Sequence, residues 1–265
     1  MISLVKKVQV NIPFTMLYES HLDHFIGHAL NPEIGIDAFA LDRFSPADFK
    51  GISKQLHERG LVITLHGPFI DLSAGSSDEM VRDVTRRRLE QTLQLVPVFK
   101  PKAVVCHLGY DHARHWYMRD LWIERSLELW SWLGQGVRDE GAMLMLENVY
   151  EQSPEEITIF FESLQSKGVG FCLDTGHQAV FSRVPLKRWL SSLGPYIRQL
   201  HLHDNSGKQD DHLALGRGNI DFMELFRQLR ALRRTPPVIT MEPHREEDLW
   251  PSLEYLEEIW PWESQ

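Results

Sequence analysis

The feature that most constrains the fold is an alternation of short apolar runs with longer segments of helical periodicity. Segments of helical periodicity predict helices at residues 17–30, 45–59, 77–99, 119–140, 153–167, 185–193, 221–233 and 250–260. Runs rich in Val, Ile and Leu predict eight strands at residues 5–12, 34–39, 61–65, 102–106, 142–146, 169–173, 197–202 and 237–241. Strands that alternate with helices pair in parallel, and eight such units are the count of a (β/α)8 TIM barrel. We therefore expect an α/β chain that forms a single TIM-barrel domain over residues 1–265.

Ionisable side chains stand at the carboxyl ends of six predicted strands. In a TIM barrel these ends share one face, on which the active site is built. The seventh loop adds a carboxylate and an imidazole, with Asp211 as an alternative to Asp210. Together the candidates are five imidazoles and four carboxylates: His66, His107, Glu147, Asp174, His177, His201, Asp210, His212 and Glu242.

A bound metal explains why so many charged groups would gather in one place. Each residue alone could be a structural polar group at a strand end, but four neighbouring carboxylates repel, and an unpaired buried charge costs several kcal/mol. A bound cation turns this repulsion into attraction, and a metal site can contribute roughly 10 kcal/mol to folding. Mixed imidazole and carboxylate ligands suit Zn, Mn or Fe better than Ca or Mg. We expect a divalent cofactor, Zn or Mn, with one to three ions per chain.

Charge and composition narrow the location and the partners. The chain has 28 Lys and Arg against 37 Asp and Glu, so its net charge is -9, which argues against a broad nucleic-acid surface but leaves room for a local basic groove. The start of the chain lacks a signal-peptide pattern, and no run of about 18 apolar residues predicts a membrane span. Cys106 and Cys172 lie in apolar runs, which favours buried thiols in a reducing compartment. We expect a cytoplasmic protein.

Seven short motifs resemble one superfamily of barrels. In chain order they are LHGPF, VVCHLG, LENV, CLDTGH, LHLHDNSG, DDHLALGRGNI and TMEP, and they span nearly the whole sequence. They resemble the xylose isomerase-like, or AP-endonuclease-2, TIM-barrel superfamily. It contains sugar-phosphate isomerases and epimerases and the endonuclease IV type of DNA repair enzyme.

The resemblance implies two different ligand patterns. The endonuclease IV pattern implies three zinc ions, held by His66, His107 and Glu147, by Glu147, Asp174, His201 and Glu242, and by His177, Asp210 and His212. The epimerase pattern implies one metal, held by Glu147, Asp174, His201 and Glu242. In that pattern Glu147 and Glu242 are also the catalytic pair that moves the proton.

The first hypothesis for function is a metal-dependent isomerase or epimerase of a small sugar or sugar phosphate. The alternative is a zinc phosphodiesterase of the AP-endonuclease kind, and a third hypothesis is a non-catalytic barrel that keeps a structural metal. The segments after the first two strands offer one basic residue, Arg43, whereas duplex binding needs several phosphate contacts. Candidate substrate contacts at the barrel mouth are Lys208, Arg217, His244 and Arg245.

Overall fold

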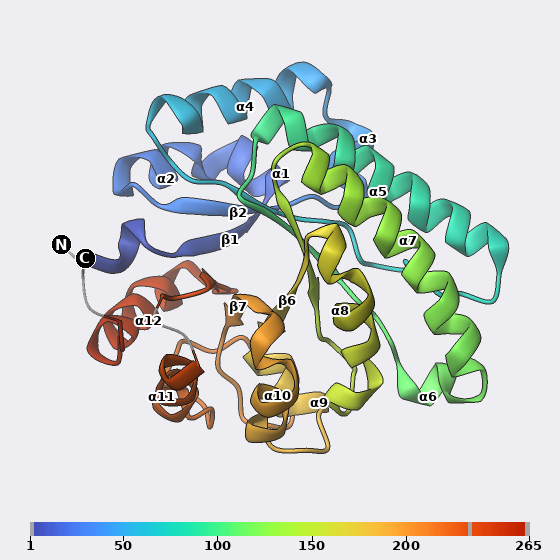
Figure 1. The fold of residues 1–265 in the computed structure, drawn as a ribbon. Helices are drawn as coiled ribbons and strands as arrows, with labels where there is room; N and C mark the ends of the chain where they lie inside the picture. The colour runs from blue at the N-terminus through green and yellow to red at the C-terminus, as the bar shows by residue number, and fades with distance from the viewer. Residues whose placement is uncertain (1–2, 233–234, 263–265) are drawn as a thin grey trace.

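Eight parallel strands close into a barrel in a computed structural model that describes residues 3–232 and 235–262 (Figure 1). They follow one another around the barrel in chain order, and the last strand pairs with the first. The strands are β1 Gln9–Pro13, β2 Asn31–Gly35, β3 Thr64–His66, β4 Ala103–His107, β5 Met143–Glu147, β6 Val169–Asp174, β7 Ile197–Leu202 and β8 Val238–Met241. The predicted (β/α)8 fold class is confirmed.

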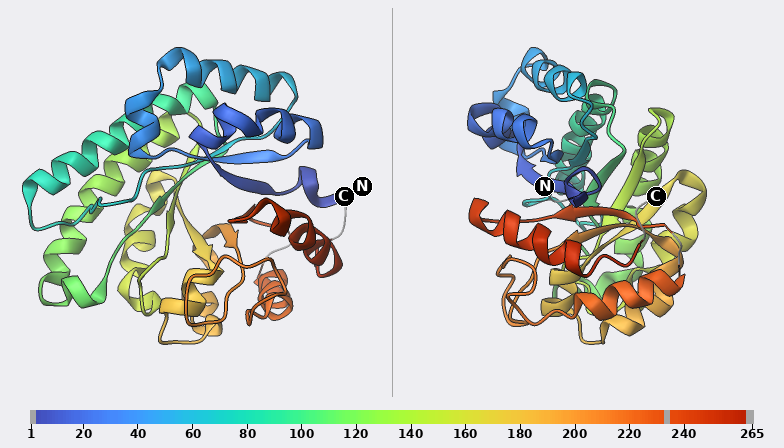
Figure 2. Two further views of the ribbon diagram at one scale, coloured as in Figure 1. Left: turned by 180° about the vertical axis from the view of Figure 1, so that it is seen from behind. Right: turned by 90° about the vertical axis from the view of Figure 1, so that its left-hand side faces the viewer.

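The helices form an outer layer around these strands, as the two views of Figure 2 show. The longer helices are α4 Pro46–Glu58, α5 Glu79–Phe99, α7 Arg119–Asp139, α10 Leu186–Leu193, α11 Phe222–Leu232 and α12 Glu246–Glu258. The shorter ones are α1 Phe14–Met16, α2 Leu22–His28, α3 Ala38–Arg43, α6 His112–His115, α8 Thr158–Leu164 and α9 Thr175–Phe181. A π-helical turn, Leu17–His21, joins α1 to α2, and 3-10 turns lie at Ser3–Lys6, Trp116–Met118, Pro154–Glu156, Gln165–Lys167 and Gly194–Tyr196. Within the described ranges, every helix is too short or too polar to cross a bilayer.

Local signals explain where the long helices begin. Ser45 and Asp48 form a reciprocal capping box before α4, with Pro46 in the first turn. The side chain of Asp78 accepts a hydrogen bond from the Met80 N–H and caps α5. The helix predicted to reach Arg233 is described as far as Leu232, since residues 233–234 lie outside the described ranges.

The second strand lies earlier than predicted, and this correction matters for the site. Residues 34–39 were expected, but β2 covers Asn31–Gly35. Asn31 begins the strand because its amide donates to the Val8 carbonyl at 3.3 Å and its oxygen accepts from the Val62 N–H at 2.9 Å. The shift places Glu33 in the middle of β2, where it is buried inside the barrel.

A second correction concerns the segment after β6. The predicted helices do not include this segment, but Thr175–Phe181 forms helix α9. The Asp174 side chain accepts a hydrogen bond from the His177 N–H at 2.6 Å and so caps this helix. The cap turns the chain immediately after the strand, which brings His177 back over the barrel end.

Candidate metal centre

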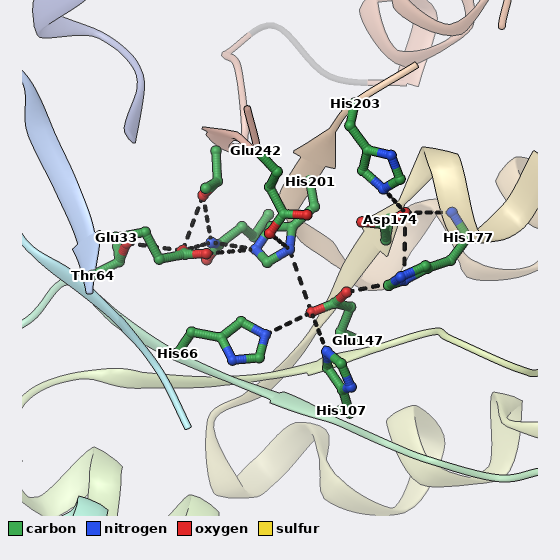
Figure 3. Close-up of polar contacts among 12 residues, drawn as sticks. Glu33, Thr64, His66, His107, Glu147, Asp174, His177, His201, His203 and Glu242 are labelled. Atoms are coloured by element: carbon green, nitrogen blue, oxygen red, sulfur yellow. Dashed lines mark hydrogen bonds and ion pairs between the residues drawn. The ribbon is translucent and has the colours of Figure 1, made fainter. Parts of the chain in front are cut away.

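Glu147, the last residue of β5, is surrounded by four imidazoles (Figure 3). Its Oε2 lies 3.2 Å from His66 Nε2, 3.7 Å from His107 Nε2 and 3.3 Å from His201 Nδ1, and its Oε1 lies 3.2 Å from His177 Nδ1. Burial opposes ionisation, but His201, His107 and the other imidazoles hold the pKa of Glu147 well below its usual range. The carboxylate is therefore charged, and its two oxygens face different imidazoles of the cluster.

Strand register brings the neighbouring groups to the same level of the barrel. His107 pairs with Glu147 across β4 and β5, and Asp174 pairs with His201 across β6 and β7. Glu242 follows β8, and its Oε1 lies 2.9 Å from His201 Nδ1. Two glutamates from different strands thus meet at one imidazole nitrogen.

A second group lies beside the first and is carried by the loop after β7. Asp210 Oδ2 lies 3.4 Å from His177 Nε2 and 3.3 Å from His212 Nε2. The loop is built around Asp204, whose buried carboxylate accepts four backbone N–H bonds at 2.8 to 3.1 Å. His212 has a φ of 47°, a left-handed conformation that is costly for a side-chain-bearing residue and is often kept at functional sites.

Three of the histidines are oriented in the same way. In each, Nδ1 bonds to a backbone carbonyl and so carries a proton, and Nε2 faces a carboxylate, where a cation can take the place of a second proton. The three pairs are His66 with Gly67 at 2.9 Å, His177 with Asn148 at 3.0 Å, and His212 with Glu242 at 3.2 Å. Burial also lowers the pKa of His107 to about 3, which keeps that imidazole neutral. Neutral imidazoles with a free nitrogen are the form that binds metal.

These contacts fit divalent cations better than they fit hydrogen bonds alone. Two ligand atoms that each lie about 2.1 Å from one ion are roughly 3 to 3.5 Å apart, close to the separations found here. The donor atoms of His66, His107 and Glu147 all lie within 4.8 Å of one another. Asp174 Oδ2 is buried without a hydrogen-bond partner, and a lone pair facing a carboxylate is repulsive unless a cation or proton lies between them. The residues present therefore fit a metal site with mixed nitrogen and oxygen ligands.

The structure brings together all nine residues that the sequence put forward as ligands. One group consists of His66, His107 and Glu147. A neighbouring group consists of Asp174, His201 and Glu242, which contact Glu147 or His177. Asp210, His212 and His177 form the outer group. Asp211 instead bonds to Ser206, so Asp210 is the loop carboxylate that faces the imidazoles.

The candidate substrate contacts differ in their surroundings. Lys208 and Arg217 are exposed on the loop after β7. Arg245 pairs with Asp248 at 3.0 Å and with Glu247 at 3.6 Å at the start of α12. His244 stacks on the ring of His212, 3.6 Å away. Of the four, His244 has direct contact with a candidate ligand.

Sequence reasoning missed His203, which is buried in the same cluster. Its Nε2 lies 3.2 Å from Asp174 Oδ1, and its ring is stacked on His212, 3.7 Å away and 4° from parallel. An imidazole lone pair lies in the ring plane, so two parallel planes this far apart cannot both contain one ion. Donor atoms of His203, His177, Asp210 and His212 all lie within 4.8 Å of one another, but the stacking favours a supporting role for His203 over a shared ion. The spacing of His201 and His203 was the available signal, since alternate strand residues share a face.

Comparisons with known proteins agree with this architecture. A family model described as xylose isomerase-like TIM barrel matches residues 31–259. Uncharacterized protein MJ1311 of Methanocaldococcus jannaschii is 28% identical over 223 residues, covering 81% of this chain and 75% of that protein.

Solved structures give the same result. The TTHB071 protein from Thermus thermophilus, in a structure soaked with ZnCl2, shares 29% identity at a TM-score of 0.81 and covers 96% of this chain and 98% of its own. A D-tagatose 3-epimerase-like protein shares 25% identity at a TM-score of 0.79, with coverage of 95% and 97%. A D-psicose 3-epimerase and an L-ribulose 3-epimerase share 16% and 19% identity, which supports the fold alone.

Proposed function

The chain belongs to the xylose isomerase-like TIM-barrel family, and from that premise we propose that it is a divalent-metal-dependent isomerase or epimerase of a small sugar or sugar phosphate. One observation carries the proposal. Glu147 and Glu242 come from different strands, yet they lie 3.3 and 2.9 Å from the same atom, Nδ1 of His201. Two carboxylates converging on one ligand nitrogen supply both a metal site and a paired acid and base.

The proposed chemistry is a proton transfer at a carbon next to a carbonyl. A bound divalent ion would polarise the substrate's carbonyl or hydroxyl and make the adjacent C–H more acidic. One of Glu147 and Glu242, as a carboxylate, would take the proton from carbon, and the other, in its protonated form, would give a proton to carbon. Return on the opposite face inverts the centre, which is an epimerisation.

The similarity to proteins of known description supports this choice. The D-tagatose 3-epimerase-like protein matches 95% of the chain, so the resemblance extends over nearly the whole barrel. Zinc was supplied to the crystal of the TTHB071 protein, which makes zinc a reasonable first metal to test beside manganese.

A zinc phosphodiesterase of the endonuclease IV kind is the second candidate. The outer group of His177, Asp210 and His212 favours it, because a one-metal epimerase needs no such group. The electrostatics disfavour it. Arg43, the basic residue of the first two strand-end segments, is paired with Glu19 at 2.8 Å, and the chain carries a net charge of -9.

Solvent exchange separates the two candidates. The metal-loaded protein is incubated in D2O with ketopentoses, ketohexoses and their phosphates, and NMR follows deuterium entering the substrate's carbon. A proton-transferring isomerase or epimerase incorporates deuterium with at least one of these sugars, and Glu242→Gln abolishes the incorporation. A parallel assay offers a duplex with an abasic site. Cleavage of that duplex without sugar exchange would reject the epimerase in favour of the phosphodiesterase.

A further inference from the structure

We propose that Glu33 is a positioning residue that sets the tautomer of His201, so that the Nδ1 lone pair points into the metal centre. The inference rests on the proposed metal-dependent function. Glu33 lies on β2, across the barrel from β7, and its side chain is fully buried. No sequence motif marked it, because the second strand had been placed after it.

The two oxygens of Glu33 have different surroundings (Figure 3). Oε2 accepts three hydrogen bonds, from Thr64 Oγ1 at 2.9 Å, Gln199 Nε2 at 2.6 Å and Thr240 Oγ1 at 3.0 Å. Oε1 has one polar neighbour of note, His201 Nε2 at 2.9 Å. The carboxylate is therefore held in a fixed orientation with its second oxygen against the imidazole.

A carboxylate oxygen lies 2.9 Å from each ring nitrogen of His201, Glu33 Oε1 from Nε2 and Glu242 Oε1 from Nδ1. A cation beside Glu242 and Glu147 would take the lone pair of Nδ1. The ring proton then lies on Nε2 beside Glu33, because an ionised carboxylate only accepts. Gln199 Nε2 also lies 3.3 Å from His201 Nε2, but its two hydrogens are directed to Glu33 and Thr240. It has no third hydrogen for the imidazole. With a cation at Nδ1, His201 therefore carries its proton on Nε2.

The proton on Nε2 leaves Nδ1 free for a metal. Nδ1 lies between Glu147 Oε2 at 3.3 Å and Glu242 Oε1 at 2.9 Å, and it makes no hydrogen bond. A carboxylate behind a ligating imidazole fixes the ring and raises its basicity, and loss of such a partner typically lowers metal affinity by about 10 to 100-fold. Glu33 lies behind His201 in this way, on the side of the ring opposite the proposed metal.

The isosteric change Glu33→Gln gives a sharp test, because the surrounding donors fix which way the amide must turn. Three donors converge on the Oε2 position, so the amide oxygen occupies it and the NH2 group faces His201 Nε2. That nitrogen must then become an acceptor, and the proton moves to Nδ1. The variant keeps shape and hydrogen bonds but presents an N–H to the metal centre.

A matched control is available in Glu151, a second buried carboxylate. Its oxygens accept from the Tyr110 N–H at 2.9 Å and the Val149 N–H at 2.6 Å. Its hydrogen bonds go to these backbone groups and to no histidine. Glu151→Gln thus places an amide in another buried carboxyl position, with no expected effect on the tautomer of His201. Burial raises the pKa of Glu151 to about 7, so the comparison is made at pH 8, where its carboxyl is mostly ionised.

The experiment measures zinc and manganese affinity of the full chain after chelator treatment, by competition with a chromophoric chelator. We expect Glu33→Gln to bind at least 10-fold more weakly than wild type while melting cooperatively, and Glu151→Gln to bind as wild type does. Equal affinity of Glu33→Gln and wild type would overturn the inference.

A second measurement uses the wild-type chain, so the inference can be tested even if Glu33→Gln does not fold. Nitrogen NMR shifts of His201 in the metal-loaded wild-type chain report its tautomer. A proton on Nε2 is expected, and a proton on Nδ1 alone overturns the inference. The proposed function fails separately, if wild type binds metal and shows this tautomer but exchanges no sugar proton.

Discussion

The rings of His212 and His244 are stacked, with their centroids 3.6 Å apart and their planes 7° from parallel. His203 covers the opposite face of His212 at 3.7 Å, so the candidate ligand is held between two other imidazoles. Its own nitrogens point to the Glu242 carbonyl and to Asp210. The stack therefore fixes the plane in which His212 can offer a lone pair.

Removing the outer ring should weaken the outer metal site. An aromatic pair contributes about 0.5 to 1.5 kcal/mol, so His244→Ala should lower the affinity for the second and later ions by about 2 to 10-fold. His244→Phe keeps a flat ring and should retain most of that affinity. Calorimetric titration with zinc measures both. Equal binding by wild type and His244→Ala would show that the stack does not position His212.

Asp210 and Asp211 form a natural pair for assigning the loop carboxylate. Asp210 lies between His177 and His212, whereas Asp211 is exposed and bonds to Ser206. Asp210→Asn should lose the ion of the outer group, and Asp211→Asn should bind as many ions as wild type. Elemental analysis of the purified variants distinguishes them. The reverse pattern would reassign the ligand to Asp211.

Stability of the metal-free chain should fall as the pH rises. Although burial opposes it, acidic neighbours raise the pKa of His177 and of His201 well above the ordinary value. A raised pKa in the folded state stabilises below the unfolded pKa of about 6.5, and this stabilisation is lost as pH rises through the folded pKa.

Melting curves between pH 6 and 9 test this sign. The chelator-treated protein should melt at progressively lower temperature over that range, whereas the metal-loaded protein should change less, because the ion replaces the protons between imidazoles and carboxylates. A metal-free melting temperature that rises with pH would contradict the assignment of these two histidines as protonated in the empty cluster.

Much of the site could be predicted because the sequence itself shows where strands end. His107, Glu147 and Asp174 each end an apolar run, and parallel register then places them at one level of the barrel. The same logic gave the eight strand-helix units. These features depend on local periodicity and on the shared direction of the strands, both of which the sequence carries.

Other parts depend on tertiary contacts that no local pattern encodes. Asn31 and Pro32 form a pattern typical of a helix end. Asn31 instead donates a hydrogen bond to the Val8 carbonyl and begins β2, so Glu33 was not recognised as a strand residue. His203 lies two residues after His201 and could in principle have been found from that spacing. The stacking of His244 on His212 depends on how two loops meet, so sequence spacing offered no sign of it.

The most direct test of the central claim is the divalent-metal content of the purified full-length chain, measured by elemental analysis beside Glu147→Gln. Because Glu147 faces four imidazoles, we expect at least one Zn or Mn ion per wild-type chain and a clear loss in the variant. A folded wild-type chain that takes up neither ion, even when each is supplied in excess, would contradict it.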